Sequence, residues 1–230
     1  MTRFFACLVA AIALMSGGPI AARAAVAGQA CFNPKSDPEV MIGDCTSIID
    51  ATGSTPIALA HAFENRGSAF MAKGDFEHAI ADFDASIRLD PEHAAVFHNR
   101  SRSWEQKGNL VHAIADLGQV VRLTPTDANA YFEFGVLLAK NGELDAAITE
   151  FDQSIRLSPI AAGVYASRGI AWGRKGDLDR AMEDFDQAIR LKPDFAAAYV
   201  NRGVTWRKKG DMVRAQSDFD KATVLGVQRQ

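Results

Sequence analysis

Five histidines are the residues of this chain best suited to metal binding or proton transfer, and their spacing limits both roles. His78 and His112 stand 34 residues apart at equivalent positions of a repeat, and His93 falls in a predicted turn. His61 and His98 lie on predicted helices, but no cysteine or carboxylate cluster joins them at the spacing of metal ligands. We therefore predict that the chain has no metal site, no catalytic histidine and no cofactor.

Other motifs that carry chemistry are missing from the sequence. The recurring Gly-Asp turns lack the alternating oxygen ligands and the closing glutamate of a calcium loop. No glycine-rich phosphate loop, G-x-S-x-G turn or H-E-x-x-H helix occurs. With 25 Lys and Arg against 28 Asp and Glu, the 230 residues carry a net charge of −3 and lack the basic surface of a nucleic-acid binder. The chain is expected to be neither an enzyme nor a nucleic-acid-binding protein.

The first residues have the pattern of a cleavable export signal. Arg3 provides a positive start, residues 4–15 are an almost unbroken apolar run, and A-x-A sites end at Ala24 and Ala27. The alternative is an uncleaved membrane anchor, but this run falls short of the roughly 20 residues that span a bilayer. We predict a signal peptide at residues 1–24, cleaved after residue 24 or 27. The protein is then periplasmic or secreted, with no stable membrane span after cleavage.

Removal of the leader takes Cys7 with it and leaves Cys31 and Cys45 as a pair in an oxidising compartment. A disulfide that closes a loop of about 15 residues stabilises by ~3 kcal/mol in the chain-entropy model. The alternatives are a reactive pair or a metal site, although a metal site needs further ligands and the nearest histidine is His61. A structural disulfide is the preferred interpretation.

The rest of the chain repeats every 34 residues, and this period defines its organisation. A Gly-Asp or related pair, a large apolar residue and a leucine recur with this step in five copies. The units span residues 60–93, 94–127, 128–161, 162–195 and 196–229. The large apolar residues are Phe83, Leu117, Phe151, Phe185 and Phe219.

Each unit has the pattern of two amphipathic helices. In the fourth unit, Gly176 is placed to end the first helix, Asp177 to cap the second, and Pro193 to stop it. Apolar and small residues recur at helical spacing, at Tyr165, Gly169 and Trp172 on the first helix and at Ala181, Phe185, Ala188 and Ile189 on the second. One pair cannot bury both apolar faces, so neighbouring pairs must stack into a solenoid.

This pattern resembles the tetratricopeptide repeat (TPR) family, whose units place aromatic, glycine, alanine and phenylalanine residues at fixed offsets. The second unit departs from the pattern with Ser101 for glycine and Leu117 for phenylalanine. The resemblance implies an all-α, right-handed superhelical solenoid of helix-turn-helix repeats over residues 60–229. The last unit matches the family at Tyr199, Gly203, Trp206, Ala215, Phe219 and Ala222.

One position of the first helix distinguishes the units. Four units carry arginine there together with an aspartate on the second helix, whereas the third unit carries Phe134 and Glu150. We predict a contact between arginine and aspartate within each unit, and shared ancestry of the four units is the alternative explanation. The pairs are Arg66 with Asp82, Arg100 with Asp116, Arg168 with Asp184, and Arg202 with Asp218.

The two ends of the array are expected to differ. Residues 38–51 echo a second helix with Cys45 in the place of Phe83, so residues 25–59 are predicted to form a strap and a degenerate capping helix. No cap follows the last unit, which would leave open the face around Ala215, Phe219 and Ala222. A homodimer through this face is one hypothesis, and a small tolerated exposed edge is the other.

The resemblance also implies that first helices line a groove that binds partner segments. Asn65, Asn99 and Asn201 match the family's groove asparagine, but the basic clamp that holds a terminal carboxylate in co-chaperone members has no counterpart here. The groove is expected to be polar in its N-terminal part, at Glu64, Ser68, His98 and Arg102, and apolar in its C-terminal part, at Phe132, Val136, Ile170, Val200 and Val204. Packing between units is the alternative role of the apolar set.

Basic residues end the first helices and are expected to complement helix dipoles rather than to form a rim for an acidic ligand. They are Lys73, Lys107, Lys140, Arg174, Lys175, Lys208 and Lys209. Taken together, the sequence predicts an exported, non-catalytic scaffold that binds a protein or peptide partner. An envelope assembly factor that binds a glycan or another non-protein ligand is the alternative.

Overall fold

The computed structural model describes residues 29–226, in which all regular elements are helices, as predicted. The signal peptide predicted at residues 1–24 lies outside the described residues. A short 3-10 helix, η1 (Ala30–Phe32), and helix α2 (Pro38–Ile49) precede five pairs of helices. The pairs are α3 (Pro56–Ala72) with α4 (Phe76–Leu89), α5 (Ala94–Gln106) with α6 (Leu110–Leu123), α7 (Ala128–Asn141) with α8 (Leu144–Leu157), α9 (Ala162–Lys175) with α10 (Leu178–Leu191), and α11 (Ala196–Lys208) with α12 (Met212–Val224).

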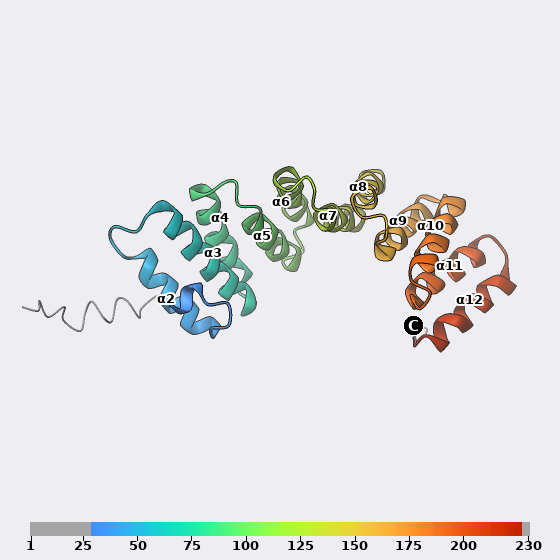
Figure 1. Cartoon of the computed structure of the whole chain (residues 1–230), viewed down its shortest axis with the longest axis horizontal. Coiled ribbons are helices and arrows are strands. Elements are labelled where there is room, and N and C mark those ends of the chain that lie inside the picture. Colours follow the sequence, from blue (N-terminus) through green and yellow to red (C-terminus); the bar gives the residue numbers. More distant parts are fainter. Residues whose placement is uncertain (1–28, 227–230) are drawn as a thin grey trace, which may run out of the picture.

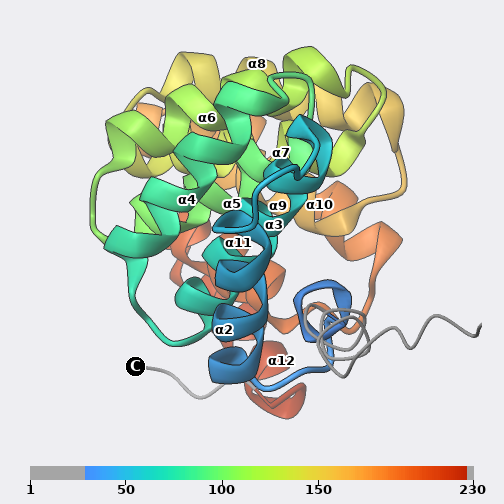
Figure 2. The same ribbon diagram turned by 90° about the vertical axis from the view of Figure 1, so that its left-hand side faces the viewer.

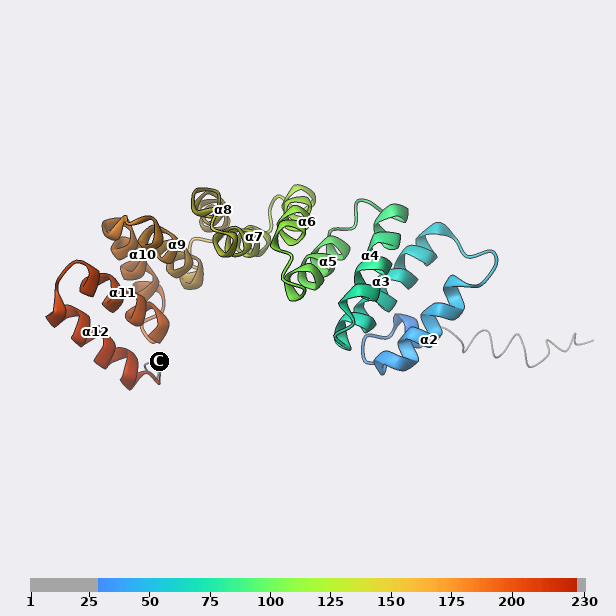
Figure 3. The ribbon, with the colours of Figure 1, turned by 180° about the vertical axis from the view of Figure 1, so that it is seen from behind.

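The helix pairs follow one another in chain order along an arch (Figure 1). The same arch is seen from behind in Figure 3, and Figure 2, viewed from the end that carries α2, shows that the row winds about its long axis. The first helices of neighbouring pairs touch, α3 with α5, α7 with α9, and α9 with α11. The first helices therefore form an inner row in which neighbours pack closely everywhere except between α5 and α7.

Glycine ends the first helix of each pair, as predicted for Gly176. The glycines that follow the first helices have positive φ values of 75–91°, which only glycine adopts without strain. Asp177 then caps α10 by accepting a hydrogen bond from the Arg180 backbone N–H at 3.1 Å. The first of these helices, α3, starts at Pro56 with Thr55 as its N-cap, four residues before the predicted unit boundary at residue 60.

A glycine of the first helix lets the two helices of a pair approach each other. A Cβ added at Gly169 would lie 2.9 Å from the ring of Phe185, and one at Gly67 would lie 2.8 Å from the ring of Phe83. The second unit has no glycine at this position of its first helix. Its smaller Leu117 leaves room for Ser101, whose hydroxyl donates to the Ala113 carbonyl at 2.9 Å. The two departures from the family pattern therefore compensate for each other.

The predicted contact between arginine and aspartate is present in all four units that carry the pair. Nε and Nη2 of Arg168 donate to the two oxygens of Asp184 at 2.9 and 2.6 Å. The remaining Nη1 bonds Asp152 on the second helix of the preceding unit, a partner that the sequence did not suggest. The same three-helix arrangement recurs in Arg100 with Asp116 and Asp84, and in Arg202 with Asp218 and Asp186.

The third unit lacks this arrangement at all of its positions. Phe134 stands in place of the arginine, and Gly118 replaces the aspartate of the preceding unit, with a Cβ added there 3.8 Å from Cζ of Phe134. Glu150 occupies the position of Asp184, is half-buried, and has no ion-pair partner among residues 29–226. Burial raises the pKa of the Glu150 carboxyl.

The N-terminal segment contains a helix, α2, that a disulfide ties to the residues before it. Cys31 and Cys45 are bonded and fully buried, and the Ala30 backbone N–H donates to Asp44 at 3.0 Å. Thr46 occupies the position that Asp84 has in the first unit, and its hydroxyl accepts a hydrogen bond from Nη1 of Arg66 at 2.9 Å. Helix α2 therefore presents to the first unit the contacts that a preceding unit would present.

The expectation of an open face around Ala215, Phe219 and Ala222 is confirmed only for Phe219, which is half-buried where its equivalent Phe185 is buried. Both alanines are buried because α12 packs them against α11, while the exposed apolar side chains are Met212, Val213 and Val224. The homodimer through the face around Ala215, Phe219 and Ala222 stays a hypothesis. No helix within residues 29–226 has the length and apolar character needed to cross a membrane.

Replacement of Gly169 by alanine tests the close approach of paired helices. We expect Gly169→Ala to destabilise the protein by roughly 1–3 kcal/mol, because the new methyl group overlaps the Phe185 ring. The measurement is urea unfolding followed by circular dichroism. Gly173→Ala on the same helix is the matched control. Its Cβ would meet Ala181 at an ordinary 3.8 Å, so the gain in helix propensity should stabilise by up to about 1 kcal/mol.

Replacement of Asp184 by asparagine tests the arginine contact. Loss of the buried carboxylate leaves Arg168 poorly compensated, and we expect Asp184→Asn to lower the free energy of unfolding by about 3 kcal/mol. Asp152→Asn removes a carboxylate that is 40% exposed and should cost about 1 kcal/mol or less. Equal effects of the two substitutions would contradict the assignment of Asp184 as the principal partner.

Candidate functional site

A cavity of about 420 Å3 lies between α5 and α7, where the second and third units meet. It brings together four of the predicted groove residues, namely His98, Arg102, Phe132 and Val136. The sequence placed these residues in one groove by repeat position, and the structure shows that they share one cavity. Its lining is completed by Ser101, Glu105, Leu117, Glu133, Leu137 and Lys140.

Two polar contacts cross this cavity from one unit to the next. Nε2 of His98 lies 2.6 Å from Oε2 of Glu133, and Nζ of Lys140 donates to Glu105 at 2.5 Å. The bond from His98 lowers the pKa of Glu133, against the opposing effect of burial, and the Asn129 amide donates to the other oxygen of Glu133 at 3.0 Å. The rim is therefore a set of charged and hydrogen-bonding groups of both signs.

Phe132 borders a second cavity as well as the first. A space of about 300 Å3 lies between α7 and the start of α9, with Ser154, Ser158 and Val164 among its lining residues. The ring of Phe132 is half-buried, and its centroid lies 6.1 Å from that of Phe151. This side chain is thus the apolar surface that two neighbouring cavities of the inner row share.

The other predicted groove residues are not gathered at these cavities. Ile170, Val200 and Val204 lie farther along the row on α9 and α11, and Ile170 is 41% exposed. The amide of Asn201 donates to the Ala197 carbonyl of its own helix at 2.9 Å. Asn65 lies half-buried on α3. Asn99 lies half-buried on α5, the helix that also carries His98.

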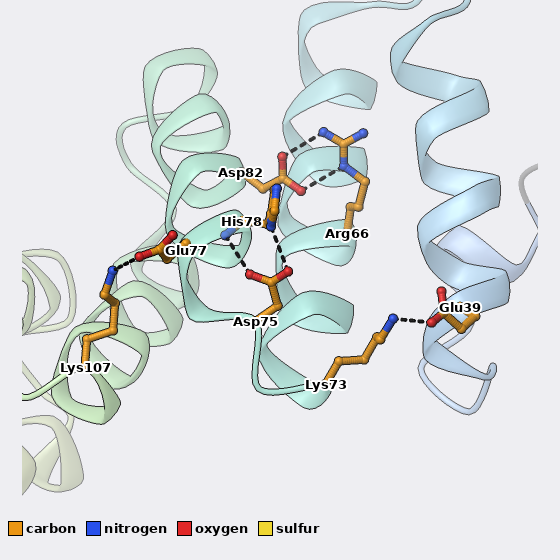
Figure 4. Close-up of polar contacts among 8 residues, drawn as sticks. All are labelled: Glu39, Arg66, Lys73, Asp75, Glu77, His78, Asp82 and Lys107. Carbon is orange, nitrogen blue, oxygen red and sulfur yellow. Dashed lines mark hydrogen bonds and ion pairs between the residues drawn. The ribbon is translucent and has the colours of Figure 1, made fainter.

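Most basic residues at the ends of the first helices bond the preceding pair of helices. Figure 4 shows Lys107 with Glu77 and Lys73 with Glu39, each reaching from a first helix to an acidic residue of an earlier helix. Lys175 and Lys209 bond Asp145 and Asp179 in the same way. Because these pairs are exposed to solvent, each contributes little to stability. These residues therefore link neighbouring units, in addition to the predicted interaction with the helix dipoles.

The junction that holds the cavity between α5 and α7 lacks the lysine–carboxylate pair and the arginine–aspartate contact that recur at other junctions. Asn141 and Val111 occupy the positions of the bonded pair Lys107 and Glu77, and Phe134 replaces the arginine of the three-helix contact. The contacts Lys140–Glu105 and His98–Glu133 link the units there instead. The repeat pattern thus changes at the place where the inner face is hollowed.

Sequence reasoning missed several residues of this cavity. The sequence did not predict the pair formed by Glu105 and Lys140. Glu133 could have been recognised, because it replaces the asparagine that three other units carry at this position, Asn65, Asn99 and Asn201. A residue that departs from its repeat position at a single junction is explained by that junction rather than by the scaffold. Such departures were the available sign of the site.

The prediction that no carboxylate joins the histidines is wrong. The structure brings His93 from the turn before α5 to His61 and Glu64 on α3, with the ligand atoms of all three within 4.8 Å of one another. His98 has its own carboxylate partner in Glu133. Spacing along the chain did not reveal these clusters because each joins residues of two units.

Comparisons with known proteins agree with the geometry of the fold. Tetratricopeptide repeat models match residues 64–128 and 112–162, and a TPR repeat model matches residues 174–210. A crystal structure of MamA is 29% identical over 69% of this chain and 93% of that chain, with a TM-score of 0.65. No curated protein sequence matches the chain.

Two further solved structures are similar in fold. YrrB, described as a TPR protein with an unusual peptide-binding site, is 20% identical over 79% of this chain and 92% of that chain, with a TM-score of 0.65. PilF from Pseudomonas aeruginosa is 16% identical over 74% of this chain and 78% of that chain, with a TM-score of 0.62.

Replacement of Glu150 by glutamine tests whether a half-buried carboxylate without an arginine partner destabilises the third unit. Because burial raises the pKa of Glu150 in the folded state, the carboxylate destabilises the fold at pH values above its unfolded pKa, near 4.3. We expect Glu150→Gln to raise the urea midpoint at pH 7 and to have little effect at pH values where the carboxyl is protonated in both states.

The exposed Glu183 provides the control for this measurement. Glu183→Gln removes the same charge and relieves only the weak repulsion that Glu183 exerts on Asp184, so the pH dependence of its urea midpoint should stay close to that of the parent protein. A Glu150→Gln midpoint that tracks the parent across this pH range would show that burial at Glu150 has no energetic consequence.

Proposed function

Because the chain belongs to the tetratricopeptide repeat family, we propose that it is a non-catalytic scaffold that binds an extended segment of a partner protein along the inner row of first helices. The observation that carries this proposal is the cavity between α5 and α7, where polar and apolar side chains predicted for a groove meet. The description of YrrB as having a peptide-binding site is consistent with the same use of the fold.

The lining of the cavity indicates what kind of segment fits. Phe132, Val136 and Leu137 offer an apolar wall to one side chain of the partner. Arg102 is exposed at the rim, so a polar or acidic residue next to that side chain finds a cation in reach. We expect a segment in which an apolar anchor adjoins a polar stretch, the anchor directed toward α7 and the polar stretch toward α5 and α3.

The proposed location is the cell envelope or the exterior. Its support is the export pattern of residues 1–27 together with the bonded pair of Cys31 and Cys45, which suits an oxidising compartment. The partner is then a protein that is exposed to the same compartment.

Replacement of Phe132 by aspartate tests the assignment of the cavity. Peptides selected from a displayed random library against the immobilised protein should bind Phe132→Asp about tenfold or more weakly, because the variant places a charge at the apolar wall. The affinities are measured by isothermal titration calorimetry with synthetic peptides. Circular dichroism establishes that the variant keeps its helical content.

Ile160→Asp is the matched control, since Ile160 is 78% exposed in the turn between α8 and α9 and lines neither cavity. It should bind the same peptides as the parent protein does. Selected peptides that bind Phe132→Asp and the parent equally would place the binding site elsewhere.

A further inference from the structure

His61, Glu64 and His93 form a cluster of potential metal ligands at the N-terminal end of the inner row. His61 and Glu64 lie one turn apart on α3, and His93 is the N-cap residue of α5 in the next unit. Nδ1 of His61 and Nδ1 of His93 each lie 3.5 Å from Oε2 of Glu64. The two imidazole rings meet edge to face with their centroids 5.8 Å apart.

The spacing of these atoms is close to that of a metal coordination shell. Zinc bonds of about 2.0–2.1 Å in tetrahedral geometry place neighbouring ligand atoms about 3.3–3.4 Å apart. Two of the three ligand separations are already 3.5 Å, and no pair of ligand atoms is farther apart than 4.8 Å. Small rotations of the two rings would bring the third separation into the same range.

The types of ligand select the class of metal. Two imidazole nitrogens and one carboxylate oxygen suit Zn2+ and neighbouring divalent transition metals, whereas Mg2+ and Ca2+ prefer sites made of oxygen alone. Three protein ligands leave a fourth position for water or for a group of a bound molecule. His61 is 44% exposed at its side chain, so the cluster is open to solvent on one side.

The scaffold does not account for these three residues. The equivalents of His61 carry no histidine, cysteine or carboxylate in any other unit. The equivalents of Glu64 include one histidine, and those of His93 include one aspartate, so no other unit has such residues at all three positions. The equivalents of Glu64 in the next two units, His98 and Phe132, line the cavity between α5 and α7. The cluster therefore belongs to the same inner row. The repeat equivalents are Ala95, Asn129, Gly163 and Ala197 for His61; His98, Phe132, Ala166 and Val200 for Glu64; and Asp127, Ala161 and Phe195 for His93.

We propose that His61, Glu64 and His93 bind a divalent transition metal ion, with Zn2+ as the reference ion, and leave one coordination position open toward the inner row. The metal joins α3 to the start of α5 and so links the first unit to the second. The site is independent of the peptide-binding proposal, since it uses none of the residues that line the cavity around Phe132.

The experiment is a titration of the untagged protein with ZnCl2 by isothermal titration calorimetry, since a histidine tag would itself bind the metal. We expect one ion per chain, and affinities about tenfold or more weaker for Glu64→Gln, His61→Ala and His93→Ala. Co2+ in place of Zn2+ should give the visible absorption of a low-coordinate site in the parent protein only. Excess Mg2+ should not displace the ion.

His112→Ala is the matched control, because His112 is exposed on α6 and its imidazole contacts Asn109, the N-cap of α6, and the ring of Trp104, neither of which is a metal ligand in the cluster. This variant should bind Zn2+ as the parent does. The proposal is overturned if the parent shows no zinc uptake, or if the double variant His61→Ala/His93→Ala retains it. Because Phe132→Asp leaves the three ligands intact, that variant should keep its zinc affinity, and failure of either proposal can be recognised separately.

Discussion

The ion pair between a first-helix arginine and a second-helix aspartate is the interaction on which the geometry of this solenoid depends. A repeat array has contacts only between neighbouring units, so the packing at each junction sets the course of the whole row. The planar guanidinium of Arg168 bonds both oxygens of Asp184 within its unit and reaches Asp152 in the unit before. Side chains of this kind are costly to bury unless they are paired, so a shift between the three helices would leave a charge without its partner. The hydrogen bonds that Arg202 donates to Asp218 accordingly raise the pKa of its guanidinium.

The N-terminal cap meets the same requirement without a further repeat. Thr46 accepts the bond that an aspartate accepts at later junctions, and Cys45 replaces the large aromatic residue at the centre of the pair. The bond to Cys31 closes the end of the stack with a short segment rather than with another helix. Covalent attachment supplies the stability that a 12-residue helix alone would lack against the open face of α3.

The junction between the second and third units differs from the others because its packing leaves the cavity that we propose as a binding surface. Phe134 and Gly118 replace a charged contact by an apolar one, and the contacts of His98 and Lys140 take over the linkage at the rim of the cavity. Glu150 is left half-buried without the arginine that its equivalents bond. A stabilising contact that recurs at other junctions is therefore missing at the junction that holds the cavity lined by His98 and Phe132.

The sequence by itself determined the helix pairs, their order and the residues that hold each pair together. The period of 34 residues repeats a local pattern, and helix ends at residues such as Gly176 and pairs such as Arg168 with Asp184 follow from positions within one unit. Contacts between units were determined only by the tertiary structure. Asp152 as the second partner of Arg168, the cavity shared by His98 and Phe132, and the meeting of His93 with Glu64 each depend on how one unit is stacked on the next. The period of the sequence specifies that units stack but not their rotation and separation, because these follow from side-chain packing across each junction.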